Sequence, residues 1–181
     1  VRVLNSRGKF GVAFRILNKA LRGNQEDPTL LCSLADVHRE RGDEDRDDIQ
    51  QAREICSRVL QSHPENFSAK VSLGHLAISN GNLGKAKKIF TRLLEDGHDE
   101  MACLKGLFLV GKAYLKKGDN KMARGLLEEV LNLNSNDIRA KNLLASIALN
   151  EGNYDETRRL AEEVLASSPN NKYAMNTMGK L

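Results

Sequence analysis

Residues 72–94, with the sequence SLGHLAISNGNLGKAKKIFTRLL, decide the fold of this chain. Gly74 comes seven positions before Gly81, Ala86 follows five positions after that glycine, and Phe90 continues the apolar side of the second half. This pattern predicts a helix, a glycine turn and a second helix, with small residues where the two helices touch. One such pair cannot bury its apolar face alone, so the chain should contain further copies of it.

Glycines at comparable positions do recur along the chain. Gly42 comes 34 residues after Gly8, Gly81 comes 39 after Gly42, Gly118 comes 37 after Gly81, and Gly152 comes 34 after Gly118. We attribute the two longer intervals to an insertion at 43–47 and to a first helix that is lengthened from Met101. We therefore predict an all-α fold, a single array of helix pairs over residues 1–181. Its expected parts are the second half of a repeat (1–27), a repeat with the insertion (28–66), a repeat (67–100), a repeat with an extended first helix (101–137), a repeat (138–171) and the start of a truncated repeat (172–181).

Small residues lie seven positions before four of these glycines, namely Ala35, Gly74, Gly111 and Ala145. We expect them to let neighbouring helices approach closely. A larger side chain there should destabilise the fold by about 1–3 kcal/mol through overpacking.

Composition limits the classes of function. A net charge of +4 with only 4% aromatic residues is too weak a signal to predict nucleic-acid binding. No apolar run approaches the length of a membrane span, so membrane insertion is not expected. Cys32, Cys56 and Cys103 are far apart and lie in helical patterns, which predicts reduced, buried thiols and a cytoplasmic location. The start at Val1 suggests a fragment of a longer protein.

The chain resembles the tetratricopeptide repeat family over nearly its whole length. The family pattern is carried by Leu104, Val110, Gly111, Tyr114, Gly118, Ala123, Leu127, Val130 and Ser135. The departures are Thr157 in place of an alanine, and His98 and Ser135 in place of the usual proline. The resemblance implies a right-handed α-solenoid of stacked antiparallel helix pairs, in which the first helix of each pair lines a concave groove.

By analogy with the family, the partner-binding residues should lie on the inward face of these first helices. The predicted groove residues are His75, Lys105, Phe108, Lys112, Lys116, Arg139, Asn142, Ser146 and Asn176. Asparagine amides offer a donor and an acceptor to an extended peptide, and the basic residues favour an acidic one. The alternative is that these lysines are merely solvated. The clamp by which some family members hold chaperone C-termini is not expected, because Cys32, Asp36, Val71 and His75 stand at its positions.

Three motif-like stretches carry no expected chemistry. Residues 106–112 match the spacing of a phosphate loop, but Ala113 replaces the metal-binding hydroxyl and the segment reads as helix. Residues 43–47 resemble a calcium loop without its glycine, and we interpret them as a solvated acidic loop. The four histidines show no metal-binding pair on one helical turn. The sequence therefore predicts no catalytic residue, no cofactor and no metal site.

The predicted function is a non-catalytic scaffold that binds a peptide or helix of a partner protein in the groove. One alternative is self-assembly into a homo-oligomer through exposed terminal repeats. Another is an auxiliary segment of a larger enzyme or signalling protein.

Overall fold

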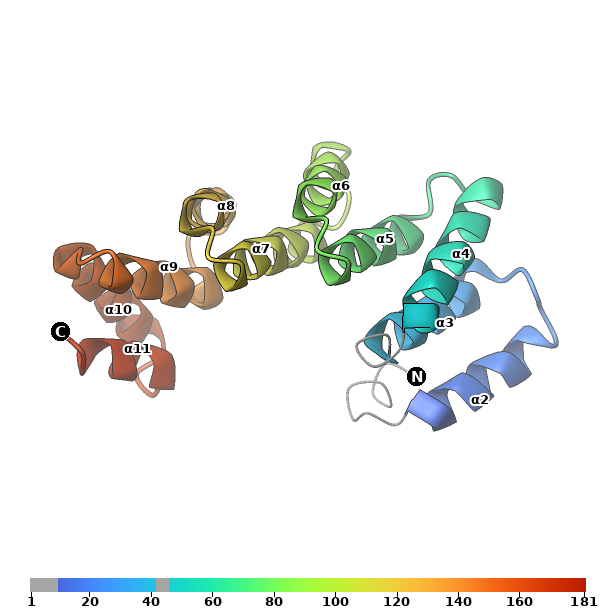
Figure 1. Cartoon of the computed structure of the whole chain (residues 1–181), viewed down its shortest axis with the longest axis horizontal. Coiled ribbons are helices and arrows are strands. Elements are labelled where there is room, and N and C mark those ends of the chain that lie inside the picture. Colours follow the sequence, from blue (N-terminus) through green and yellow to red (C-terminus); the bar gives the residue numbers. More distant parts are fainter. Residues whose placement is uncertain (1–9, 42–45) are drawn as a thin grey trace. The chain divides into compact units, whose positions relative to one another are not determined.

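The structure, a computed structural model, describes residues 10–41 and 46–181 (Figure 1). In these ranges the chain forms ten α-helices and no strand, which confirms the predicted all-α class. The helices are α2 (Phe10–Leu21), α3 (Pro28–Arg41), α4 (Arg46–Ser62), α5 (Phe67–Ser79), α6 (Leu83–Glu95), α7 (Glu100–Lys116), α8 (Asn120–Leu133), α9 (Ile138–Asn150), α10 (Tyr154–Ser167) and α11 (Lys172–Met178).

The helices belong to two compact units, residues 1–106 and residues 107–181, and the boundary falls inside α7. In the first unit, α3 packs on α4 and α5 packs on α6, while α2 lies against α3 and α4 against α5. In the second unit, α9 packs on α8 and α10, and α11 packs on both α10 and α9. Each unit is therefore built from antiparallel helix pairs that contact their sequence neighbours, as expected of a repeat protein.

Short glycine turns join the helices of a pair. Gly118 and Gly152 have φ angles of +80° and +77°, a left-handed conformation that costs glycine little. The residue after each turn glycine then caps the second helix: Asp119 accepts a hydrogen bond from the backbone N–H of Met122 at 3.1 Å. The Gly-Asn and Gly-Asp dipeptides thus end one helix and start the next.

Phe90, on α6, is the largest fully buried side chain of the first unit, with 0% exposure. Two glycines lie directly against its ring, Gly74 on α5 and Gly106 on α7. A Cβ atom added to Gly74 would stand 2.6 Å from Phe90 Cζ, which is closer than real Cβ atoms come. This confirms the close approach predicted at Gly74. Gly111 differs, because a Cβ there would meet Leu127 Cγ at 3.4 Å, an ordinary contact.

Thr157 replaces the alanine usual at its position and is nevertheless completely buried on α10. Its hydroxyl donates a hydrogen bond to the carbonyl oxygen of Asn153 at 2.7 Å. The polar group is therefore satisfied inside its own helix, and the departure from the family pattern leaves the packing intact.

The structure defines the start of α4 and the end of α11. The helix after the predicted insertion begins at Arg46, so Arg46 and Asp47, which the sequence places in the insertion, belong to its first turn. The rest of the predicted acidic loop, together with Gly42 and Gly8, lies outside the described residues. At the other end α11, in the predicted truncated repeat, ends at Met178 and is capped by Gly179.

Candidate partner-binding surface

The first helices of the pairs, called here the front helices, carry the predicted groove residues. In the first unit, Arg39 of α3, His75 of α5 and Lys105 of α7 lie close enough to interact electrostatically. His75 is largely buried and packs its ring against Phe90, with centroids 5.3 Å apart. Burial, and then the positive charges of Arg39 and Lys105, lower the pKa of His75 to about 4. His75 is therefore neutral at pH 7.

Arg39 has an incomplete set of partners on this surface. Its Nη2 donates to Glu40 Oε1 at 3.3 Å, and its Nε lies 3.6 Å from Asp36 Oδ1, too far for a hydrogen bond. That Nε atom is buried and has no hydrogen-bond partner in the part of the chain that the structure describes. Asp36 in turn accepts a hydrogen bond from the hydroxyl of Ser72 at 3.0 Å, which links α3 to α5.

The lysines of α7 are the exposed cations of this set. Lys105, Lys112 and Lys116 follow one another at intervals of seven and four residues, so they share one side of the helix. All three are exposed. Among residues 10–41 and 46–181 none of the three forms an ion pair.

Arg139 and Phe108 contact each other, and of the two only Arg139 is exposed. The guanidinium of Arg139 lies 4.9 Å from the centroid of the Phe108 ring, and Phe108 is only 9% exposed. Arg139 also donates from Nη2 and Nε to the carboxylate of Asp137, at 2.5 and 3.1 Å. Asp137 is buried and caps α9. Burial alone would raise the pKa of Asp137, but the bonds from Arg139 and the backbone hold it below its ordinary value.

Asn142 is half-buried and already uses one of its donors. Its Nδ2 atom lies 3.4 Å from Oδ1 of Asn171, the residue that caps α11. The equivalent contact in the first unit joins the thiol of Cys32 to Asn66 Oδ1 at 3.6 Å, where Asn66 caps α5. The side chain at this position therefore contacts the residue that caps the N-terminus of the next front helix. Of the other predicted residues, Ser146 is half-buried and Asn176 is exposed.

The sequence did not predict the cluster in which the buried His38 and Asp48 meet the partly exposed Arg41. Asp48 Oδ1 lies 2.6 Å from His38 Nδ1, and Arg41 Nε donates to Asp48 Oδ2 at 2.5 Å. Asp48, which directly follows the predicted acidic loop of 43–47, is 3% exposed. Burial alone would raise the pKa of Asp48, but the bonds from His38 and Arg41 lower it overall. One signal was available: His38 continues the apolar stripe of α3 and therefore needed a polar partner.

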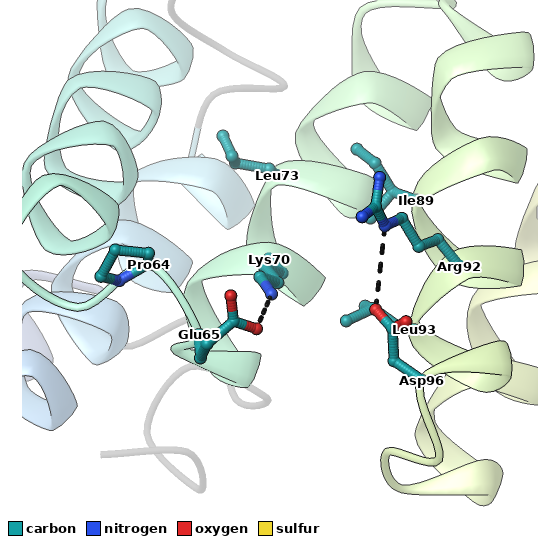
Figure 2. Close-up of a pocket in the computed structure, with 8 residues that line it drawn as sticks. All are labelled: Pro64, Glu65, Lys70, Leu73, Ile89, Arg92, Leu93 and Asp96. Carbon is teal, nitrogen blue, oxygen red and sulfur yellow. Dashed lines mark hydrogen bonds and ion pairs between the residues drawn. The ribbon is translucent and has the colours of Figure 1, made fainter.

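A cleft of about 370 Å³ lies on α5 and α6 (Figure 2). Leu73, Ile89 and Leu93 provide its apolar walls. Lys70 projects into it from α5 and binds Glu65 Oε2 at 2.6 Å, while Arg92 on α6 lies 3.8 Å from Asp96. These charges were not among the predicted site residues, because Lys70 and Arg92 do not occupy groove positions of the family pattern.

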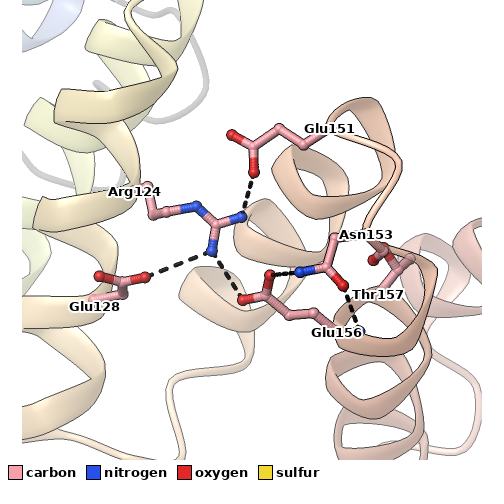
Figure 3. A network of polar contacts seen from close by, with 6 residues as sticks. All are labelled: Arg124, Glu128, Glu151, Asn153, Glu156 and Thr157. Carbon is pink, nitrogen blue, oxygen red and sulfur yellow. Dashed lines mark hydrogen bonds and ion pairs between the residues drawn. The ribbon is translucent and has the colours of Figure 1, made fainter.

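A second charged network holds α8 to the turn and helix that follow α9 (Figure 3). Arg124 donates to Glu156 Oε1 at 2.8 Å and to Glu151 Oε2 at 2.6 Å, and Glu128 lies 3.5 Å away. The bonds from Glu156 and Glu151 raise the pKa of Arg124 above its already high ordinary value. The side chain is 23% exposed, so the network is partly shielded from water. Its role is to hold helices together.

The structure shows what the segment with phosphate-loop spacing does, and whether the described residues include a possible metal site. Residues 106–112 lie inside α7, where Gly106 makes room for Phe90. In the described ranges no three His, Cys, Asp or Glu side chains are grouped so that they could hold a metal ion. Within the same ranges no helix is both long enough and apolar enough to cross a membrane.

Comparison with known protein families identifies the repeat. Models of the tetratricopeptide repeat match residues 44–107 and 109–172. No match was found among curated proteins.

Solved structures share the fold at low sequence identity. The crystal structure of MamA has a TM-score of 0.65 and 16% identity, covering 98% of this chain and 95% of that one. A thermophilic tetratricopeptide repeat protein of Thermus thermophilus has a TM-score of 0.62 and 17% identity, covering 98% and 93%. YrrB, described as a protein of this type with an unusual peptide-binding site, has a TM-score of 0.56 and 19% identity, covering 91% and 89%. The chain belongs to the tetratricopeptide repeat family, whose fold generally serves as a protein-interaction scaffold.

Proposed function

We propose that this protein is a non-catalytic scaffold that binds an extended acidic segment of a partner protein along its front helices. Lys105, Lys112 and Lys116 of α7 supply the cations, and Arg39 supplies a further donor on α3. The predicted contact with Arg139 is less direct, because its charge is balanced by Asp137.

The observation that carries this proposal is the row of exposed lysines on one side of α7. Burial is the largest cause of the low pKa of His75, and the positive charges of Arg39 and Lys105, on two other helices, lower it further. Lys105, Lys112 and Lys116 form no ion pair among the described residues, whereas Arg124 and Lys141 are paired with glutamates. Uncompensated cations on one face raise the local concentration of acidic segments and speed their association.

A charge-reversal experiment tests the proposal. The probe is a blocked, fluorescein-labelled peptide of alternating glutamate and serine, about 12 residues long, which spans roughly 40 Å when extended. Its glutamine analogue is the uncharged control. We expect the double substitution Lys105→Glu and Lys112→Glu to weaken binding by about tenfold or more at low salt. The matched control is Lys88→Glu with Lys121→Glu, which reverses two exposed lysines of α6 and α8. Equal losses from both pairs would contradict the proposal, since only net charge would then matter.

A second candidate function is self-association. Tyr173 and Met175 on α11 are 77% and 55% exposed, an unusual exposure for large apolar side chains. A second copy of the chain could cover them. Sedimentation over a range of concentrations tests this, and Tyr173→Lys with Met175→Lys should abolish any concentration dependence.

A further inference from the structure

One side of α2 is exposed, although the same side is buried in the second helices of the other pairs. The register is given by a completely buried residue near the start of each of these helices (Ala13, Ala52, Ala86, Ala123 and Thr157). Seven residues after it, α4, α6, α8 and α10 have a residue that is at most 2% exposed (Val59, Leu93, Val130 and Val164). The corresponding residue of α2, Ala20, is exposed.

The same difference appears three residues after the register residue. Ile16 of α2 is 48% exposed, whereas Leu126 of α8 and Leu160 of α10 are 1% and 3% exposed. Leu126 lies against the first helix of its own pair, because a Cβ atom added to Gly111 of α7 would meet the Cβ atom of Leu126 at 3.5 Å. Ile16 and Ala20 are about one turn apart and share this side of α2, which we call the open side. Among the described helices α2 packs chiefly on α3.

The open side of α2 is basic. Arg15, Lys19 and Arg22 are exposed, and none of them forms an ion pair within residues 10–41 and 46–181. All three line a hollow of about 520 Å³ whose described wall contains no carboxylate. Residues 1–25 contain six lysines and arginines and no aspartate or glutamate, whereas the rest of the chain has more carboxylates than cations. The described neighbours therefore leave the positive charge of α2 uncompensated.

Lys19 occupies a position that is charged and paired across helices in two other pairs. Six residues after the register residue, α10 has Glu163, which binds Nζ of Lys141 on α9 at 2.6 Å. The corresponding Arg58 of α4 lies 3.9 Å from Glu26, in the turn before α3. In both cases the opposite charge belongs to the first helix of the same pair or to the turn before it. A helix that covered α2 in the same way would be expected to meet Lys19 with a carboxylate.

We propose that the open side of α2 binds an amphipathic helix of a partner protein. Apolar side chains of that helix pack on Ile16 and Ala20, with Val12 at the edge, and its carboxylates bind Lys19 and Arg15. The bound helix takes the place beside α2 that α9 takes beside α10. The site includes no residue of the front helices, so it does not depend on the function proposed above.

Charge argues against two other sources of the covering helix. Residues 1–9 contain three basic residues and no carboxylate, so they would repel Lys19. Residues 172–181 of a second copy, which include the exposed Tyr173 and Met175, contain no carboxylate either. An anionic membrane surface would suit the charge, but on α2 only Val12 and Ile16 are large apolar side chains that are exposed. The register of buried residues in the other pairs favours a helix instead.

Nuclear magnetic resonance of the full chain, with labelled methyl groups, tests the proposal. The probe is a blocked peptide with three copies of Ala-Glu-Leu-Ala-Ala-Leu-Glu, a helical repeat that places glutamates beside a leucine stripe. One control peptide has lysine in place of every glutamate, and the other has alanine in place of every leucine. We expect the probe to shift the methyl signals of Val12, Ile16 and Ala20, and both control peptides to bind at least about fivefold more weakly.

Charge reversal in the protein distinguishes a specific site from general attraction. Lys19→Glu with Arg15→Glu should weaken binding of the glutamate peptide by about tenfold at low salt, and should allow the lysine peptide to bind. Both side chains are exposed, so the fold should be retained. The matched control is Arg53→Glu with Lys88→Glu, which reverses exposed cations of α4 and α6 and should change little.

The proposal is wrong if the glutamate and lysine peptides bind equally, or if the charge reversal on α2 does not exchange their affinities. It is also wrong if the three methyl signals do not move up to millimolar peptide. Shifts with protein concentration alone would assign the open side to a second copy, and stronger shifts with vesicles of phosphatidylserine and phosphatidylcholine would assign it to a membrane; either result overturns the proposal. Lys105→Glu with Lys112→Glu should leave the shifts on α2 unchanged, which separates this site from the front-helix proposal.

Discussion

Gly106 of α7 lies flat against the ring of Phe90 on α6, so that even a methyl group at Gly106 would overlap the ring atoms. The sequence offered another interpretation of this glycine, as part of a segment with phosphate-loop spacing. The contact explains instead why position 106 has no side chain: the residue is buried where two helices meet. This packing relationship leads to the first prediction.

Gly106→Ala should destabilise the protein by about 1–3 kcal/mol, because the ring of Phe90 is enclosed and cannot move aside. Urea unfolding followed by circular dichroism measures the change. Gly84→Ala, on the same helix as Phe90, is the control: a Cβ there meets nothing within 4 Å, so alanine should stabilise α6 slightly. Gly111→Ala should be nearly neutral, which corrects the overpacking expected there from the sequence. A large loss at Gly84 or Gly111 would show that helix packing is tighter than described.

Asp48→Asn should cost about 1–3 kcal/mol, since it leaves His38 and Arg41 with a weaker acceptor in a buried site. Asp47→Asn is the matched control, because Asp47 precedes Asp48 on the same turn but is exposed. Thermal unfolding of both variants measures the difference. Equal stability of the two variants would mean that the contacts of Asp48 with His38 and Arg41 add nothing to stability beyond the loss of one negative charge.

The same cluster predicts a pH dependence. The pKa of Asp48 is lowered in the folded protein, so its stabilising contribution is complete above the unfolded pKa of about 4. It is lost as the pH falls through the lower folded value. The stability difference between the wild-type protein and Asp48→Asn should therefore shrink in acid. A difference that stays constant down to pH 2 would contradict the assigned protonation.

His75 provides a direct probe of the front-helix charges. Its folded pKa of about 4 lies below the unfolded value, so the unfolded chain binds the proton first and stability decreases as the pH falls from about 6.5 towards 4. Lys105→Gln should raise the pKa of His75, measured from its ring resonances, because it removes one of the two positive charges. Lys88→Gln should leave it unchanged. A normal His75 pKa near 6.5 in the wild-type protein would show that the ring is not buried as described.

Arg124→Met should destabilise the second unit by about 1–2 kcal/mol, because three glutamates then face one another without their shared cation. Arg158→Met, an exposed arginine on α10, should change little. Hydrogen exchange in α8 and α10 locates the effect. If the amides of α8 and α10 exchange equally slowly in both variants, apolar packing alone joins these helices.

The repeating fold was predictable because its signals are local. A turn glycine such as Gly152, the cap after it and the helical spacing of apolar residues are all visible along the chain. Partnerships between helices were not predictable in the same way. Nothing in the order of residues indicates that Asp137 neutralises Arg139, or that Asp48 turns inward, because both depend on where two neighbouring helices place their side chains.

In the candidate site, too, local features were predictable from the sequence and contacts between helices were not. The face on which Lys105 and Lys112 lie follows from helical periodicity, and both are exposed in the structure. Phe108 and His75 occupy positions of the same pattern, but Phe108 is buried against Arg139 and His75 is half-buried against Phe90. Periodicity identifies a face of a helix, whereas packing decides which of its residues a partner can reach.

Mapping of the glutamate–serine peptide by backbone amide shifts tests the central claim most directly. We predict that the perturbed amides lie on α3, α5 and α7 around Arg39, His75 and Lys105, and that the glutamine analogue perturbs them much less. Shifts confined to the second helices of the pairs (α6, α8 and α10), or equal shifts with both peptides, would contradict the account.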